Sequence, residues 1–289
     1  MNTSTVYLNG EFLPLNEAKI SVLDRGFLFG DAVYEVIPAY GGRLFRLEQH
    51  LQRLDNSLSE VRIKPPLSHD EWRGILEKLL PESNGQDQSV YLQVSRGSAD
   101  KRDHVIPPGI VPTIFAMTTP ISAPDPEKAR KGITAITLDD IRWEHCNIKA
   151  TTLLANVLLK QQAFDEGATE SILIRDGQAI EGAASNLFVI SNGLIITPPK
   201  SHHLLPGITR DLVLELAADA GLPYAEASIG IMDLEAADEI WMTSSTREIM
   251  AVTTLNGKTV GTGEPGPIWQ HMTQLYQACK ERLRLGAEC

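Results

Sequence analysis

The sequence has few cysteines and no concentration of positive charge. Its three cysteines, Cys146, Cys279 and Cys289, are an odd number without the paired spacing of a zinc site, so we expect free thiols and a reducing, cytoplasmic compartment. Lys and Arg number 26 against 37 Asp and Glu, which gives a formal net charge of −11, and no block of five or more basic residues occurs. This composition argues against a nucleic-acid partner, because proteins that bind phosphate backbones cluster their Lys and Arg residues.

Long apolar runs are absent as well. No stretch approaches the roughly 20 apolar residues that a membrane-spanning helix needs, and the first residues lack the charged and apolar regions of a secretory signal. We therefore expect no membrane partner. The chain does have an ordinary globular balance, with 43% hydrophobic and 22% charged residues. Its 289 residues exceed what one compact core usually supports, which favours two domains.

Turn signals and apolar periodicity predict a mixed set of elements. Asn9-Gly10 predicts a hairpin, because this dipeptide accepts the positive φ angles of a type I′ turn, and three further Asn-Gly or Asp-Gly dipeptides lie beyond residue 150. Apolar residues spaced by three and four predict a helix from Leu47 onward, and Ser68 with Glu71 forms the capping box of a second helix. Strands and helices in this uneven order favour α+β domains over a doubly wound parallel sheet.

The composition changes at residues 119–127, TPISAPDPE, where three prolines favour an extended connector. We therefore expect an N-terminal domain over residues 1–118, a linker over 119–127 and a C-terminal domain over 128–289.

Lys149 lies in the segment Ile141–Asn156, IRWEHCNIKATTLLAN, where an irregular stretch passes into a helix. The residues that follow it, Ala150 to Thr152, are small, as where a chain leaves a strand edge. An exposed ammonium is the commonest role of a lysine, so a catalytic role depends on residues elsewhere in the chain.

The run LPGITRD at residues 205–211 predicts a site for phosphate. A helix that begins at Thr209 after the Pro-Gly turn leaves the backbone N–H groups of Ile208 and Thr209 unpaired, and the helix dipole adds partial positive charge there. A helix capped by Thr209 with nothing bound is the alternative. No GxGxxG or Walker motif occurs, so the sequence does not indicate a nucleotide as the ligand that carries this phosphate.

A phosphate site and a candidate lysine together indicate pyridoxal phosphate, which needs an amine for its aldehyde and an acid for its ring nitrogen. Glu181 ends a short strand and precedes Gly182, Ala183 and Ala184, which are small enough to let a flat ring approach the backbone. It is our candidate for the acid. Taken alone, a glutamate before a glycine is more often a solvated turn residue.

The sequence resembles the fold-type IV pyridoxal-phosphate aminotransferases in six blocks that follow the family's order. The blocks are RGFLFGDAVYEV near the N-terminus, the helix with Arg53, NIKATTLL around Lys149, EGAASNLF from Glu181, LPGITRD, and TSSTREI at residues 243–249. The resemblance implies an α+β fold with a smaller N-terminal α/β domain. It also implies a larger, mixed, β-barrel-like C-terminal domain that carries the lysine and the phosphate site.

The resemblance also implies roles for individual residues. Lys149 matches the Schiff-base lysine, Glu181 the partner of the ring nitrogen, and Arg53 the arginine that reaches the cofactor phosphate. Four more positions match cofactor contacts: a residue that packs on the ring, phosphate-binding backbone and hydroxyl groups, and a hydroxyl where the family commonly has threonine. These are Leu205, Ile208, Thr209 and Ser245, in that order.

Within the family the sequence is most similar to the D-amino acid aminotransferases. Arg102 and His104 match the pair with which that group, together with Tyr34, binds the substrate carboxylate, and which comes from the neighbouring subunit of a homodimer. Without the other blocks an exposed polar loop would be the simpler interpretation. Leu154 stands where branched-chain aminotransferases usually carry tyrosine. Ala183 and Ala184 replace serines common in the D-amino acid group, which puts the hydrogen bonds of those serines in doubt.

These matches imply ping-pong transamination between a D-amino acid, such as D-alanine, and a 2-oxo acid, such as 2-oxoglutarate, through an aldimine on Lys149. The alternatives are a branched-chain L-amino acid aminotransferase, an aminodeoxychorismate lyase of the same fold, or a member that binds the cofactor without catalysis. We expect no metal: His145 and Cys146 diverge as neighbours, and His202 and His203 are interpreted as loop histidines.

Overall fold

The computed structural model describes residues 4–80, 86–122 and 126–287. Among these residues, contacts group 4–122, 148–153 and 283–287 into unit 1, and 126–147 and 154–282 into unit 2. This division differs from the predicted domains at Lys149, which lies in unit 1 because its segment bonds to the strand β3 that starts at Ala32.

Unit 1 is built on a six-stranded sheet in the order β2-β1-β6-β5-β3-β4. All neighbouring strands are antiparallel. The strands are β1 Thr5–Leu8, β2 Glu11–Pro14, β3 Ala32–Tyr40, β4 Arg43–Leu44, β5 Gln88–Ser95 and β6 Thr113–Pro120. The first pair is the hairpin predicted at Asn9-Gly10, whose φ angles of 49° and 102° are both positive.

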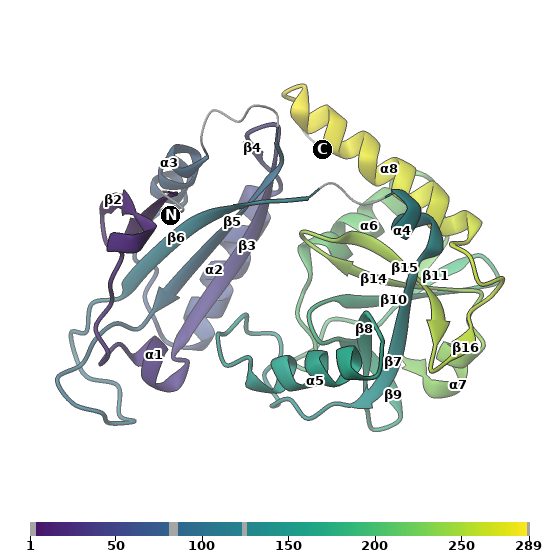
Figure 1. The fold of residues 1–289 in the computed structure, drawn as a ribbon, viewed down its shortest axis with the longest axis horizontal. Helices are drawn as coiled ribbons and strands as arrows, with labels where there is room; N and C mark the ends of the chain where they lie inside the picture. The colour runs from purple at the N-terminus through teal and green to yellow at the C-terminus, as the bar shows by residue number, and fades with distance from the viewer. Residues whose placement is uncertain (1–3, 81–85, 123–125, 288–289) are drawn as a thin grey trace. The chain divides into compact units, whose positions relative to one another are not determined.

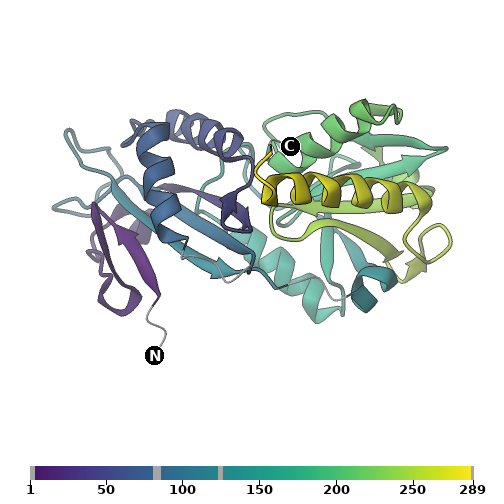
Figure 2. The ribbon, with the colours of Figure 1, turned by 90° about the horizontal axis from the view of Figure 1, so that it is seen from above.

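Two helices cover one face of this sheet (Figures 1 and 2). They are α2 Leu47–Glu60 and α3 His69–Leu79, and their apolar stripes form one core with the strands. The capping box of Ser68 and Glu71 is present, as predicted. The short helix α1 Arg25–Phe29 precedes β3, and a single 3-10 turn covers Leu15–Glu17.

Six strands of unit 2 close into a barrel in the order β10-β14-β15-β7-β8-β9, because β9 also pairs with β10. The sheet is mixed, since β7 runs parallel to both of its neighbours. Strands β11, β12, β13 and β16 extend it. The bounds are β7 Ile133–Asp139, β8 Glu170–Arg175, β9 Gln178–Gly182, β10 Asn186–Ser191, β11 Leu194–Thr197, β12 Tyr224–Glu226, β13 Ile229–Gly230, β14 Glu239–Ser244, β15 Glu248–Leu255 and β16 Lys258–Thr259. The α+β class and the barrel of the larger unit are thus confirmed.

Helices lie outside this barrel (Figure 1). They are α4 Pro126–Lys131, α5 Leu154–Asp165, α6 Ile208–Asp219, α7 Ile231–Glu235 and α8 Pro267–Arg284. Helix α5 packs on β7 and β8, and α6 on β12 and β14. The barrel interior is apolar, with side chains such as Leu187, Ile240 and Met242 fully buried.

Three observations bear on the remaining expectations from the sequence. The predicted linker 119–127 overlaps the end of β6 and the start of α4, so both of its ends are regular structure. Cys146 is free and buried, but Cys279 is disulfide-bonded, so the expectation of free thiols is wrong for Cys279. Among the described residues, no helix combines the length and the apolar character needed to cross a membrane.

Candidate functional site

Lys149 is held beside the start of β3 in unit 1. Its carbonyl accepts a hydrogen bond from the N–H of Tyr34 at 2.9 Å, and its own N–H donates to Ser57 Oγ of α2 at 3.2 Å. The Nζ atom lies 4.2 Å from the centre of the Tyr34 ring, a distance at which the ring face attracts a cation. The structure therefore brings together two predicted site residues and fixes the lysine backbone from two elements.

Arg53 points from α2 to Glu35 of β3. Arg53 Nε donates to Glu35 Oε1 at 2.7 Å and Nη2 to Oε2 at 2.8 Å, while His50 Nδ1 lies 2.8 Å from the same Oε2. Glu35 is fully buried. Burial alone would raise the pKa of Glu35, but the charge and hydrogen bonds of Arg53 outweigh it and hold this pKa far below its usual value. The two-point contact fixes the orientation of the guanidinium.

Arg102 and His104 lie in the loop between β5 and β6, and both pack on Phe29 of α1. The Cζ atom of Arg102 is 5.0 Å, and the ring centre of His104 5.2 Å, from the centre of the Phe29 ring. Arg25 Nη2 holds the loop by donating to the carbonyl of His104 at 3.2 Å. Both predicted residues are exposed. In the described part of the chain, neither forms a hydrogen bond or ring contact with Tyr34.

Glu181 of β9 presents a buried carboxylate to three donors in unit 2. Arg142 Nη1 donates to its Oε1 at 2.5 Å, Asn186 Nδ2 to Oε2 at 3.1 Å, and the N–H of Leu205 reaches both oxygens at 3.3 and 3.2 Å. Burial raises the pKa of Glu181 to about 7, against the lowering effect of the Arg142 charge. A further cation placed against this carboxylate would favour its ionised form.

Leu205, Ile208 and Thr209 lie where α6 starts. The helix begins at Ile208, one residue before the predicted start, and its N-cap Gly207 has no side chain to cap the first N–H groups. A Cβ atom on Gly207 would lie 1.8 Å from Asn186 Oδ1, so glycine permits this close approach. The N–H groups of this first turn have no side-chain cap, and together with the helix dipole they suit an anion.

Buried hydroxyl groups lie near Glu181, on strand β14 and in the turn between β9 and β10. Thr243 of β14 pairs with Asn186 in the sheet, and Asn186 pairs with Glu181. The hydroxyl groups of Thr243, Ser244 and Ser185 are buried and have no hydrogen-bond partner among the described residues. Ser245 follows in the half-buried turn after β14. An acid, free hydroxyls and an uncapped helix terminus in one unit fit the phosphorylated pyridine ring expected from the sequence.

Three residues of these arrangements were missed by sequence reasoning: Glu35, Arg142 and Asn186. Glu35 lies 18 residues before Arg53, and Arg142 lies 39 residues before Glu181. The one local signal is the run Asp139-Asp140-Ile141-Arg142 before the lysine, because opposite charges so close in the sequence often form a local ion pair. Arg142 does pair with Asp140, through Nε at 2.8 Å.

Comparison with known proteins places these features in a family. The sequence model described as amino-transferase class IV matches residues 32–255. The chain is 41% identical to the D-alanine aminotransferase of Bacillus licheniformis over 272 residues, 94% of this chain and 95% of that protein. It is 37% identical to the D-alanine aminotransferase of Staphylococcus epidermidis over 273 residues, 94% and 96% of the two chains.

Solved structures share the fold. The T.th. branched-chain amino acid aminotransferase with pyridoxamine 5′-phosphate superposes with a TM-score of 0.89 at 27% identity, over 96% of this chain and 94% of that one. The branched-chain amino acid aminotransferase from Escherichia coli gives a TM-score of 0.85 at 26% identity, with the same coverage. A hypothetical aminotransferase from Mycobacterium tuberculosis, in its PLP-bound form, gives 0.84 at 26% identity over 95% and 98%.

Proposed function

The chain belongs to the class IV aminotransferase family, and we propose that it is a pyridoxal-phosphate enzyme that transfers the amino group of a D-amino acid, such as D-alanine, to a 2-oxo acid. The observation that carries this proposal is the 37–41% identity to D-alanine aminotransferases over nearly the whole chain. The structural neighbours are branched-chain aminotransferases at 26–27% identity, a lower similarity that supports the fold and the cofactor more than the substrate.

When bound, pyridoxal phosphate accepts the amino group and withdraws electrons from the α-carbon of the substrate. We assign to Lys149 the amine that would attach the cofactor and would remove the proton from the substrate Cα. The position of Nζ over the Tyr34 ring supports this role, because a fixed backbone and one aromatic contact confine the amine to a small region.

Further residues are assigned to cofactor binding. Glu181 would place a negative charge against the ring nitrogen, and its buried, triply hydrogen-bonded carboxylate supports that role. The start of α6 would bind phosphate, together with Arg53, whose guanidinium is oriented by Glu35. The residues assigned to the phosphate and the ring face are Arg53, Leu205, Ile208, Thr209 and Ser245.

Tyr34, Arg102 and His104 are assigned to the substrate carboxylate. Arg102 and His104 pack on Phe29 and are exposed, which suits a pair offered to a second subunit. We therefore propose a homodimer in which each subunit supplies this pair to its partner. We also propose a cytoplasmic location from the low cysteine content, although the disulfide of Cys279 counts against it. Cell fractionation tests this location.

A panel of paired D and L amino donors with 2-oxoglutarate tests the substrate assignment. We expect conversion of D-alanine and little conversion of L-leucine. Conversion of L-leucine without D-alanine would instead support the branched-chain alternative, the activity for which the structural neighbours are named.

The role of Lys149 has a separate test. Borohydride reduction followed by peptide mass spectrometry should find the cofactor on the peptide that contains Lys149, and Lys149→Ala should lose both this adduct and transamination. The matched control is Lys258→Ala, since Lys258 is an exposed lysine of unit 2 far along the chain. Retained transamination in Lys149→Ala would remove this residue from catalysis.

A further inference from the structure

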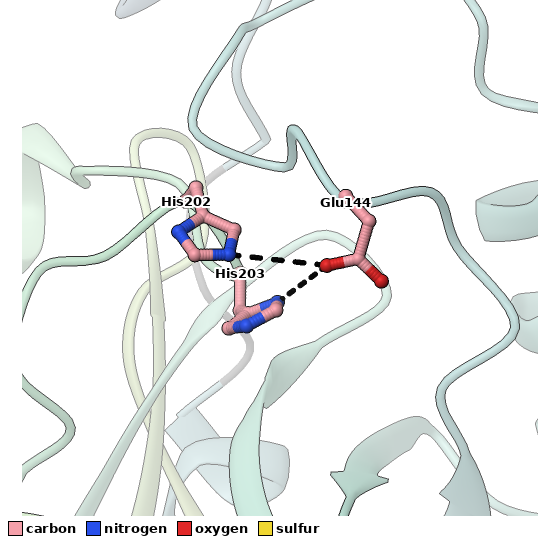
Figure 3. Close-up of side chains that lie close together, drawn as sticks. All are labelled: Glu144, His202 and His203. Carbon is pink, nitrogen blue, oxygen red and sulfur yellow. Dashed lines mark ion pairs between the residues drawn. The ribbon is translucent and has the colours of Figure 1, made fainter.

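Glu144, His202 and His203 form a cluster of potential metal ligands in unit 2, separate from the residues assigned to cofactor and substrate. Glu144 Oε2 lies 3.8 Å from His202 Nε2 and 3.6 Å from His203 Nδ1, and the three ligand atoms all lie within 4.8 Å of one another. Figure 3 shows the carboxylate facing both imidazole rings. Neither distance is short enough for a good hydrogen bond, so the three groups face one another without satisfying one another.

The backbone fixes the two segments that carry these side chains. The carbonyl of His202 accepts hydrogen bonds from the N–H groups of Cys146 at 2.7 Å and Asn147 at 3.3 Å. Arg142 Nη2 donates to the carbonyl of His203 at 3.3 Å. The two backbone segments that carry Glu144 and the histidines are therefore held together before any ligand binds, which lowers the ordering cost of a shared ligand.

We propose that this cluster binds a divalent cation of the zinc class. Zinc takes imidazole nitrogen and carboxylate oxygen at about 2.0–2.2 Å, and a tetrahedral ion with such bonds separates its ligand atoms by roughly 3.3 Å. The two measured separations exceed this value by only a few tenths of an ångström. The third separation, between the ligand atoms of His202 and His203, is at most 4.8 Å, so side-chain rotations can close the set. A fourth position would remain for water or another ligand.

Exposure allows an ion to enter. The side chains of Glu144, His202 and His203 are 70%, 58% and 30% exposed. Three protein ligands with an open position resemble an exchangeable site more than a closed structural one. Imidazole and carboxylate ligands also suit cobalt and nickel, whereas magnesium and calcium prefer sites made of oxygen alone.

Arg175 is the competitor for this site. Its Nη1 donates to His203 Nδ1 at 2.8 Å and lies 3.3 Å from Glu144 Oε1. The hydrogen bond requires an unprotonated Nδ1, so the lone pair that zinc needs is present. Arg175 also bonds to Asp140 Oδ2 and to the carbonyl of Arg142, so it can release His203 and remain bound. A nearby cation still lowers the affinity, which makes the ion exchangeable.

A cation bound at this cluster would affect the loop that leads from His203 to Leu205. His203 is two residues before Leu205, whose N–H donates to Glu181. A cation that joins Glu144 to His202 and His203 would restrain this loop. We therefore expect zinc to raise the melting temperature of the protein as its concentration passes the dissociation constant. This inference goes beyond the proposed function and does not depend on it.

Isothermal titration of the cofactor-loaded protein with zinc chloride tests the proposal, with cobalt chloride as a spectroscopic probe. We expect one exchangeable equivalent of zinc per chain and cobalt absorption bands typical of four-coordinate sites. The double variant Glu144→Gln, His202→Asn should lose at least about tenfold in zinc affinity, the lower end of what even an indirect disturbance of a metal site costs.

The control is His145→Asn, an exposed histidine of the same segment that lies outside the cluster. It should bind zinc as the wild type does. Equal zinc affinity in the double variant and the wild type would overturn the proposal, as would absence of binding by the wild type. Loss of the site in His145→Asn with retention in the double variant would overturn it as well.

Discussion

Glu181 is subject to two opposing effects. Burial raises the pKa of its carboxyl group to about 7, while the adjacent Arg142 lowers it. The carboxylate must be ionised to balance a protonated ring nitrogen, so Arg142 keeps the useful form populated near neutral pH. Asp140, which binds the other side of Arg142, keeps that guanidinium in place through Nε at 2.8 Å and Nη2 at 2.9 Å. Arg142 is thus a positioning residue.

Replacing Arg142 tests this balance. In Arg142→Met the burial of Glu181 is opposed only by the remaining hydrogen bonds, such as that of the Leu205 N–H, so the pKa of Glu181 should rise. The acid limb of the kcat profile should then move to higher pH by about one unit or more, because a charged partner at hydrogen-bond distance has effects of that size. Lys258→Met, which removes an exposed charge, is the control. An unshifted acid limb in Arg142→Met would contradict the positioning role.

The buried pair of Glu35 and Arg53 predicts a dependence of stability on pH. The folded-state pKa of Glu35 lies below its ordinary value of 4.5. The pair therefore stabilises the fold above about pH 4.5, and this stabilisation is lost as pH falls toward the folded-state pKa. Glu35→Gln should cost about 3–5 kcal/mol at pH 7, since it leaves Arg53 buried without its charge partner. The free energy of unfolding should also vary less below pH 4.5. Urea denaturation between pH 7 and 3 measures both, and an unchanged slope would contradict the assignment.

At the scale of elements, α6 depends on its close approach to β10. Gly207 ends the loop before α6, and its α-carbon faces the side-chain amide of Asn186, which in turn donates to Glu181. The same contact therefore positions the helix terminus assigned to phosphate and the acid assigned to the ring nitrogen.

Two glycine substitutions separate this contact from general effects of a methyl group. Gly207→Ala would place a Cβ 1.8 Å from Asn186 Oδ1, so we expect a loss of about 1–3 kcal/mol in stability, together with weaker binding of pyridoxal phosphate. Gly74→Ala lies in α3 with nothing within 4 Å of the new Cβ, so it should stabilise by up to about 1 kcal/mol. Denaturation midpoints and cofactor titrations measure both. Equal effects of the two substitutions would show that Gly207 needs no special space.

The sequence predicts best those elements whose structure is determined by residues close together in the chain. The capping box of Ser68 and the hairpin at Asn9-Gly10 need only a few residues, and both are present. The linker differs because proline has two uses there. Pro120 ends β6, where a missing N–H is tolerated, and Pro126 is the first residue of α4.

In the candidate site, too, local patterns in the sequence predict only part of the structure. Local patterns indicate Lys149, Glu181 and the start of α6, and a resemblance that spans the chain indicates the other predicted residues. Their partners depend on tertiary contacts that no local pattern reveals. In the sequence, Glu35 is one residue of a predicted strand and Arg142 is one of several nearby charged residues, so neither stands out. The cluster of Glu144, His202 and His203 joins segments 58 residues apart. Even the unit to which Lys149 belongs is decided by the backbone hydrogen bonds of its segment to β3.

At the scale of the whole molecule, exposed apolar side chains favour assembly. Phe27 and Val105 are 68% and 74% exposed in unit 1, close in sequence to Phe29 and His104, which contact each other. In unit 2, α5 exposes Leu154, Val157 and Leu158, whose spacing places them on one face. Exposed apolar groups of this kind often mark interfaces between subunits, and they support the proposed homodimer.

A mixing experiment tests whether Arg102 acts across such a dimer. Lys149→Ala and Arg102→Ala should each be nearly inactive as homodimers. If Arg102 serves the partner subunit, a mixed dimer contains one site with both residues intact. Random reassociation of equal amounts gives mixed dimers as half of the population, so activity should recover to roughly a quarter of the wild-type value. If Arg102 serves its own subunit, no mixed dimer has an intact site and activity stays at the level of the separate variants. Lys149→Ala mixed with the wild type controls for reassociation, since its activity should fall in proportion to the wild-type chains present.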